Sequence, residues 1–260
     1  MRDLSVTLIQ CELAWEKPGD NRRQIGQIID GLAEATDIIV LPEMFTTGFS
    51  MNALGNAESP GGDTEQWLAE LAVRHDCALT GSIAVEADHG VYNRMLFVTP
   101  ENKVYYDKRH LFRMAGEHKR YLQGEQRVIA NWRGWRILLQ VCYDLRFPVF
   151  SRNREDYDLA LYVANWPSAR RQHWRQLLIA RAIENQACVV GVNRVGSDAR
   201  GLDYSGDSLA IAADGALLKD MGNENGAARV VLSGAALQKY REGFPCQLDA
   251  DGFQLDPGES

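Results

Sequence analysis

The chain has 260 residues, of which 45% are hydrophobic, and its formal net charge is −7 with a pI near 5.3. This length can bury a substantial core as one domain, and the negative charge argues against a nucleic-acid surface or an anionic membrane as partner. The first predicted elements are a strand over residues 4–9, an amphipathic helix over 21–35 and a strand over 38–41. This order predicts a βαβ opening.

Further strands and helices alternate along the rest of the chain. The pattern predicts helices over 64–75, near 149–154 and over 171–186, and strands over 78–85, 91–99, 104–106, 135–141, 159–164, 189–192, 209–213 and 229–232. Two βαβ-rich halves predict an α/β fold in which two sheets pack on each other with helices outside. Residues 248–260, with Gly, Pro and acidic side chains, are typical of a mobile tail or a partner-binding arm. The predicted domain therefore covers residues 1–247.

The five cysteines predict a reducing compartment. Their number is odd, they lack a paired spacing, and the N-terminus lacks the apolar stretch of a signal peptide. No run approaches membrane-spanning length, so we expect a cytoplasmic protein with no membrane partner. Cys11, Cys77 and Cys188 lie in apolar runs typical of a core. The five histidines never pair with Cys or Glu at ligand spacing, so no metal site is predicted.

Cys142 is different, because it ends the apolar run 137–141 and is followed at once by Tyr143 and Asp144. A turn after a strand exposes a side chain and aims the following backbone N–H groups at whatever binds there, as a nucleophile with an oxyanion site requires. A buried core cysteine is the alternative for this residue taken alone.

Two ionisable residues stand at similar positions. Glu43 follows the apolar run 38–41, and Lys108 follows the strand-like segment 104–106. Side chains at the carboxyl ends of strands converge on one crevice in open α/β sheets. Glu43 could then accept the thiol proton, Lys108 could stabilise negative charge and Cys142 could attack. A surface charge is the alternative for each residue alone.

These three residues lie in segments that resemble the signature blocks of the nitrilase superfamily, carbon–nitrogen hydrolases with a Glu-Lys-Cys triad. The segments are Leu41-Pro-Glu43-Met-Phe45, Tyr106-Asp-Lys108-Arg-His-Leu-Phe112 and Val141-Cys142-Tyr-Asp-Leu-Arg-Phe-Pro148. The resemblance runs from about Leu4 to about Ser233. It implies a four-layer αββα sandwich and a homodimer that pairs through the helices after the nucleophile strand, where Trp166 and Trp174 would add apolar area.

Within that superfamily the chain looks most like the ω-amidases, which hydrolyse the terminal amide of 2-oxoglutaramate and 2-oxosuccinamate. Those enzymes carry a further glutamate after the lysine block, and Glu117 matches it in its spacing to Gly124. An exposed residue in a polar run is the alternative for Glu117. An N-carbamoyl amino acid amidohydrolase or an aliphatic amidase would use the same triad, while a nitrilase or an inactive binding module is a more distant alternative.

The chemistry of amide hydrolysis fits these residues without any cofactor. Glu43 would take the proton of Cys142, Lys108 and the N–H of Tyr143 would hold the oxyanion, and protonated Glu43 would release ammonia to leave a thioester. Water activated by Glu43 would hydrolyse this intermediate. The expected partner is thus a small-molecule amide.

Four neighbouring side chains are candidates for substrate binding. Phe45, Tyr143 and Trp166 would form the pocket walls, with a core position as the alternative for each. Arg146 could bind a substrate carboxylate, although its place after the nucleophile turn favours an ion pair with a nearby acid that braces the turn. Arg109 and Lys119 are further candidates for anchoring the carboxylate.

Overall fold

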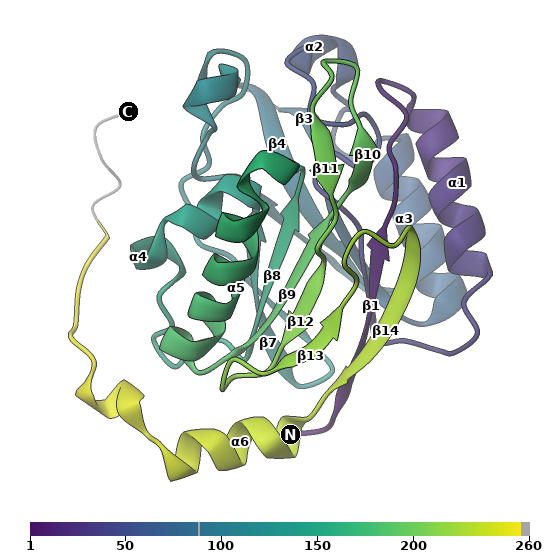
Figure 1. Cartoon of the computed structure of the whole chain (residues 1–260). Coiled ribbons are helices and arrows are strands. Elements are labelled where there is room, and N and C mark those ends of the chain that lie inside the picture. The colour runs from purple at the N-terminus through teal and green to yellow at the C-terminus, as the bar shows by residue number, and fades with distance from the viewer. Residues whose placement is uncertain (88, 256–260) are drawn as a thin grey trace.

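Two six-stranded sheets packed face to face form the centre of the molecule, and helices cover their outer faces (Figure 1). The computed structural model describes residues 1–87 and 89–255. This arrangement is the four-layer αββα sandwich that the sequence predicts, and the α/β fold class is confirmed.

The first sheet has the strand order β14-β1-β2-β3-β4-β5. Its strands are β14 (Gly226–Leu232), β1 (Leu4–Gln10), β2 (Ile38–Val40), β3 (Ala78–Ala87), β4 (Gly90–Val98) and β5 (Lys103–Asp107). Strands β1, β2 and β3 are parallel, and the other neighbours pair antiparallel. Helices α1 (Pro18–Asp30) and α3 (Asp63–His75) pack on the outer face.

The second sheet has the order β13-β12-β9-β8-β7-β6. Its strands are β13 (Leu217–Asp220), β12 (Leu209–Ile211), β9 (Cys188–Asn193), β8 (Leu159–Ala164), β7 (Trp135–Val141) and β6 (Ile129–Trp132). Strands β7, β8 and β9 are parallel. Helix α5 (Arg171–Asn185) covers the outer face of this sheet, and the short helix α4 (Pro148–Ser151) lies nearby (Figure 1).

The strands bury alternate residues in two different cores, as the period of two in a strand dictates. In β8, Leu159, Leu161 and Val163 face the core between the two sheets, whereas Ala160 and Tyr162 face α5. Strand β1 divides its apolar side chains in the same way between the central core and the layer under α1 and α3. Because both faces are covered, these strands are continuous apolar runs in the sequence.

Several elements differ from the sequence-based expectation. Helix α1 ends at Asp30 rather than at residue 35, because the backbone N–H of Gly31 already caps it. Helix α6 (Gly234–Gly243), strand β6 and a small hairpin of β10 (Val195–Ser197) with β11 (Asp203–Ser205) were not predicted. These are short or amphipathic segments whose formation depends on the surface they pack against.

The expected C-terminal tail begins within a short 3-10 helix, η5 (Cys246–Asp249). From there the chain runs in an extended path past α4 (Figure 1). The ring of Phe253 lies under the guanidinium of Arg154, 4.4 Å from its central carbon, and Leu255 lies in a surface hollow beside Val149. Residues 256–260 of the expected tail lie outside the described part of the chain.

Two tryptophans expected on a dimer surface are instead interior. Trp166 and Trp174 are 3% and 1% exposed, and their rings pack on each other with centroids 5.6 Å apart. Their area is therefore already used within the layer between the second sheet and α5.

Among the described residues, the helices are all too short or too polar to cross a lipid bilayer.

Candidate active site

The carboxyl ends of three strands bring Glu43, Lys108 and Cys142 together. Lys108 directly follows β5, Cys142 directly follows β7, and Glu43 lies three residues beyond the end of β2. Cys142 begins the 3-10 helix η3 (Cys142–Arg146) and has a φ of 46°, in the left-handed region that side chains other than glycine rarely adopt. Such strain is typical of a nucleophile held at a sharp strand-to-helix turn.

The ammonium group of Lys108 lies between two buried carboxylates. Lys108 Nζ donates to Glu43 Oε1 at 2.8 Å and to both carboxylate oxygens of Glu117 at 3.0 Å. All three residues are fully buried. The structure thus brings Glu117, which sequence similarity alone suggested, into direct contact with Lys108, and the ammonium group links it to Glu43.

Two asparagines complete this cluster, and the sequence analysis did not assign a role to either. Asn93 Nδ2 donates to Glu43 Oε1 at 2.8 Å and to Glu117 Oε1 at 3.2 Å. The backbone N–H of Asn165 donates to Glu43 Oε2 at 2.8 Å. The asparagine within the mostly apolar strand β4 was the available signal, because a buried amide needs specific partners.

Burial and mutual charge set the protonation of the cluster. Burial opposes the charged form of Lys108, but the carboxylates of Glu117 and Glu43 outweigh it and raise its pKa above the usual range. Burial also raises the pKa of Glu117, which the Lys108 ammonium opposes. Lys108 is therefore a permanent cation in the folded protein.

The surroundings of Cys142 favour the protonated form of its thiol. Burial and the charge of Glu43 raise its pKa well above the ordinary value, and Lys108 lowers it by less. Cys142 Sγ donates to the carbonyl oxygen of Asn165 at 4.0 Å, and the backbone N–H of the same residue donates to Glu43, so a carboxylate that can accept the thiol proton lies beside the sulfur.

The carboxylate of Asp144 holds the turn that presents Cys142. It accepts hydrogen bonds from the backbone N–H of Val141 at 2.9 Å, from the hydroxyl of Tyr106 at 2.8 Å and from the backbone N–H of His110 at 2.9 Å. Asp144 is fully buried. The structural role expected for this residue agrees with these contacts.

A narrow cavity of about 60 Å³ opens over Cys142. Besides Cys142 and Lys108 it is lined by Phe49, Phe112, Ala115, Tyr143, Arg146, Asn165, Trp166, Pro167, Arg170, Asp198, Arg200, Leu202 and Tyr204. Cys142 is partly exposed at this surface. Glu43 and Glu117 lie behind it, out of contact with solvent.

Three of the four expected substrate-binding residues line this cavity, namely Tyr143, Trp166 and Arg146. Phe45 does not. It is fully buried against Trp67, with ring centroids 6.2 Å apart, under α3. Gly81 on β3 leaves room for its ring, since a Cβ there would lie 2.8 Å from it. Phe49 lines the cavity where Phe45 was expected, and the centre of its ring lies 5.1 Å from Lys108 Nζ.

Arg146 makes no ion pair with an acidic side chain among the described residues, contrary to one of the two roles expected for it. Its guanidinium lies 4.7 Å from the centre of the Trp166 ring and donates to His173 Nδ1 at 3.0 Å. The other two candidate anchors lie elsewhere. Arg109 lines a separate surface hollow, and Lys119 is exposed away from the cavity.

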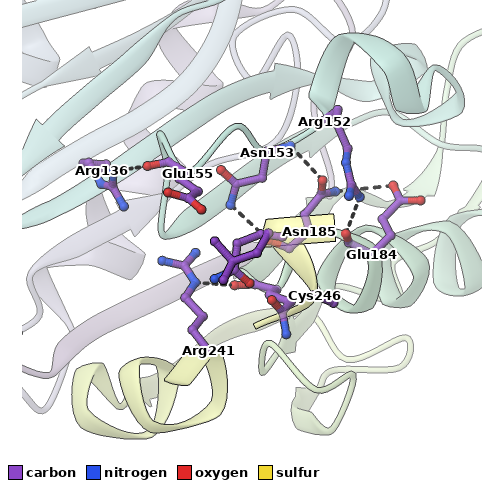
Figure 2. Close-up of a pocket in the computed structure, with 11 residues that line it drawn as sticks. Arg136, Arg152, Asn153, Glu155, Glu184, Asn185, Arg241 and Cys246 are labelled. Carbon is purple, nitrogen blue, oxygen red and sulfur yellow. Dashed lines mark hydrogen bonds between the residues drawn. The ribbon is translucent and has the colours of Figure 1, made fainter. Parts of the chain in front are cut away.

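A second cavity of about 390 Å³ lies at the opposite end of the second sheet, beside the amino ends of its parallel strands (Figure 2). Its arginines are held by the protein itself. Arg241 donates to the carbonyl of Gln186 and to Asp158, and Arg152 donates to the carbonyl of Glu184. Neither cavity contains a cluster of three or more potential metal ligands within the described residues.

Comparison with known proteins agrees with this geometry. The carbon-nitrogen hydrolase family matches residues 5–241. The chain belongs to the carbon–nitrogen hydrolase family. The fold and the enzyme class expected from the three motifs are therefore confirmed.

Individual relatives are similar over nearly their full length. The chain is 51% identical to "Omega-amidase YafV" of Yersinia enterocolitica over 98% of this chain and 100% of the relative. It is 32% identical to a 2-oxoglutaramate amidase of Bacillus subtilis, over 93% of this chain and 95% of the relative. A solved CN-hydrolase superfamily protein of Xanthomonas campestris, which carries an arsenic adduct in its active site, superposes with a TM-score of 0.96 at 46% identity, over 98% and 100% of the two chains.

Proposed function

We propose that the protein is an ω-amidase, which hydrolyses the terminal amide of small 2-oxo dicarboxylate monoamides such as 2-oxoglutaramate and 2-oxosuccinamate. The observation that carries the proposal is the partly exposed Cys142 in the wall of a narrow cavity, beside the buried pair of Glu43 and Lys108. The relatives named omega-amidase and 2-oxoglutaramate amidase support the choice of substrate.

In the first half of the reaction, Glu43 accepts the proton of Cys142 as sulfur attacks the amide carbon. The tetrahedral oxyanion is held by Lys108 and by the backbone N–H of Tyr143. An ammonium has three N–H donors. Lys108 directs one to Glu43 and one to the two oxygens of Glu117, which leaves the third for the oxyanion. Protonated Glu43 then gives its proton to the leaving nitrogen, and ammonia departs from a thioester.

In the second half, Glu43 removes a proton from water as the water oxygen attacks the thioester carbonyl. The same donors hold the second oxyanion, and the departing sulfur of Cys142 recovers the proton from Glu43. Glu117 and Asn93 hold Lys108 and Glu43 in place through both halves, since Glu117 accepts from Lys108 and Asn93 donates to both carboxylates. No cofactor takes part in these steps.

The experiment that tests this proposal is ammonia release from a panel of 2-oxoglutaramate, glutamine, N-carbamoyl amino acids and simple nitriles. We expect the highest kcat/KM on 2-oxoglutaramate, and no activity from a Cys142→Ala variant that keeps the wild-type circular dichroism. Hydroxylamine added during turnover should trap the acyl group as a hydroxamate. A faster reaction with an N-carbamoyl amino acid would overturn the substrate assignment, and a folded, active Cys142→Ala variant would overturn the mechanism.

A further inference from the structure

Two arginine side chains lie near each other at the partly exposed side of the active-site cavity. Arg146 belongs to η3, directly after the nucleophile, and Arg170 ends the 3-10 helix η4 (Ser168–Arg170). Each guanidinium lies over an aromatic ring, Arg146 at 4.7 Å from the centroid of Trp166 and Arg170 at 5.5 Å from that of Phe112. Burial and the charge of Arg170 together lower the pKa of Arg146.

Neither arginine has a carboxylate partner among the described residues. The neighbouring Arg171, by contrast, donates to both oxygens of Asp207 and forms an ion pair with it. Within the described part of the chain, the one acidic residue that lines the cavity is Asp198, and its carboxylate is occupied within its own hairpin. It accepts from the backbone N–H groups of Arg200 and Leu202 and from the hydroxyl of Tyr204.

Two like charges held close together and partly out of water repel each other unless an anion lies between them. Stacking on aromatic rings fixes the planes of the guanidinium groups but leaves their charge uncompensated. Most of the protein's other arginines form an ion pair with an acidic side chain, which compensates their charge. An anionic group of the substrate would do the same for Arg146 and Arg170.

We propose that Arg170 is a specificity-determining residue that, together with Arg146, binds the carboxylate of the substrate while Cys142 attacks the amide at its other end. The inference rests on the proposed function and names the recognition element of that site. Both arginines sit on segments that also carry catalytic-site residues, since Arg146 shares η3 with Cys142 and η4 follows Asn165 and Trp166 closely in the chain. The carboxylate-to-amide distance of the substrate is thereby selected.

The same pair explains discrimination against α-amino acids. The ammonium group of an amino acid amide stands next to its carboxylate, so it would approach two guanidinium groups together with the carboxylate. A 2-oxo group brings no charge and offers an acceptor for the remaining N–H groups of the arginines. Preference for the 2-oxo acid over the amino acid is therefore an electrostatic property of this pair.

The test compares an anionic amide with a neutral one of the same length, 2-oxoglutaramate and pentanamide. We expect Arg170→Gln to raise KM for 2-oxoglutaramate about ten-fold or more, with kcat nearly unchanged, because a charge-assisted contact made equally in ground and transition states is lost. The kcat/KM for pentanamide should stay within about three-fold of wild type. Arg170→Lys, which keeps the charge but not the planar fork, should recover part of the loss.

Arg113→Gln is the matched control, because Arg113 is an exposed arginine on η1 (Arg113–Ala115) that does not line the cavity. It should leave both KM values unchanged. Equal losses on the anionic and the neutral amide in Arg170→Gln, or no rise in KM, would overturn the proposal.

A binding measurement separates this inference from the proposed function. In a Cys142→Ala background, calorimetry with glutarate reports carboxylate binding without turnover. If wild type fails on 2-oxoglutaramate but Arg170→Gln still weakens glutarate binding about ten-fold, the proposed function is wrong and the carboxylate site stands. Equal glutarate affinity with and without Arg170 would overturn the carboxylate site, whatever the preferred amide.

Discussion

Lys108 is the residue on which the catalytic cluster depends most, because it is a buried cation between two buried carboxylates. The cost of burying these charges is offset only while all three are present. Removal of the cation would leave Glu43 and Glu117 facing each other across the site.

We predict that Lys108→Met lowers kcat by a factor of about one hundred or more, because an oxyanion donor is lost. The variant should also be less stable than wild type near neutral pH. Without the ammonium, nothing offsets the burial that raises the pKa of Glu117 above that of the unfolded chain, so stability is retained at low pH and lost as the pH rises. Urea unfolding at pH 4.5 and 7.5 measures this, and an equal stability difference from wild type at both pH values would contradict it.

We predict that three buried cysteines make the folded protein less stable at alkaline pH. Burial raises the pKa of Cys11, Cys77 and Cys188 to about 12 in each case. Above about pH 8.5 the unfolded chain releases these protons while the folded chain keeps them, so each thiol removes up to about 1.4 kcal/mol of stability per pH unit. Between pH 8 and 10.5 the urea midpoint of unfolding should fall with rising pH in both proteins, but less steeply in Cys77→Ala than in wild type. Identical slopes would refute the assignment of this effect to the buried thiol.

At the scale of an element, the turn after β7 is fixed by one carboxylate. Asp144 ties Val141, Tyr106 and His110 to the segment that carries Cys142. Asp144→Ala would leave buried donors unpaired and free the turn.

We predict that Asp144→Ala lowers kcat by about a hundred-fold although Asp144 does not line the cavity, because small displacements of a nucleophile are costly. Tyr106→Phe is the comparison variant, since it removes a single donor to Asp144 and should have a much smaller effect. The measurements are kcat and the urea midpoint. A kcat in Asp144→Ala equal to that of wild type would show that the other contacts of η3 suffice to hold Cys142.

The sequence predicted the strand ends that carry Glu43, Lys108 and Cys142, because long apolar runs reveal strands and the residue after each run marks its end. It placed Tyr143 and Trp166 at the cavity correctly, but it assigned Phe45 where Phe49 lies. The left-handed turn at Met44 sends Phe45 into the core and leaves Phe49 at the cavity. The path of this loop places the two rings, and no periodicity in the sequence encodes it.

The hairpin of β10 and β11 shows a second limit of sequence-based prediction. Its strands have three residues each, and it supplies Asp198, Arg200, Leu202 and Tyr204 to the cavity wall. Short strands with little apolar alternation give a weak signal. Their position over Cys142 follows from the packing of the two sheets rather than from the local sequence.

At the scale of the whole molecule, the outer face of α4 and α5 remains apolar in places after folding. Val149 on α4 is 57% exposed and Ile183 on α5 is 49% exposed. The interior positions of Trp166 and Trp174 mean that these smaller side chains would have to provide the apolar contacts of the expected dimer. A second copy packed on this face would extend the four layers to eight.

We predict that the protein is a homodimer at micromolar concentration and that Ile183→Glu converts it to a monomer, because a symmetric interface would bury the new charge twice without a partner. Light scattering of the purified protein measures the mass. Val73→Glu on α3 is the matched control: Val73 is 65% exposed but lies on the helix layer of the other sheet, so the variant should remain dimeric. A wild-type protein that is monomeric at every concentration would refute the dimer. An Ile183→Glu variant that stays dimeric while Val73→Glu dissociates would place the interface elsewhere.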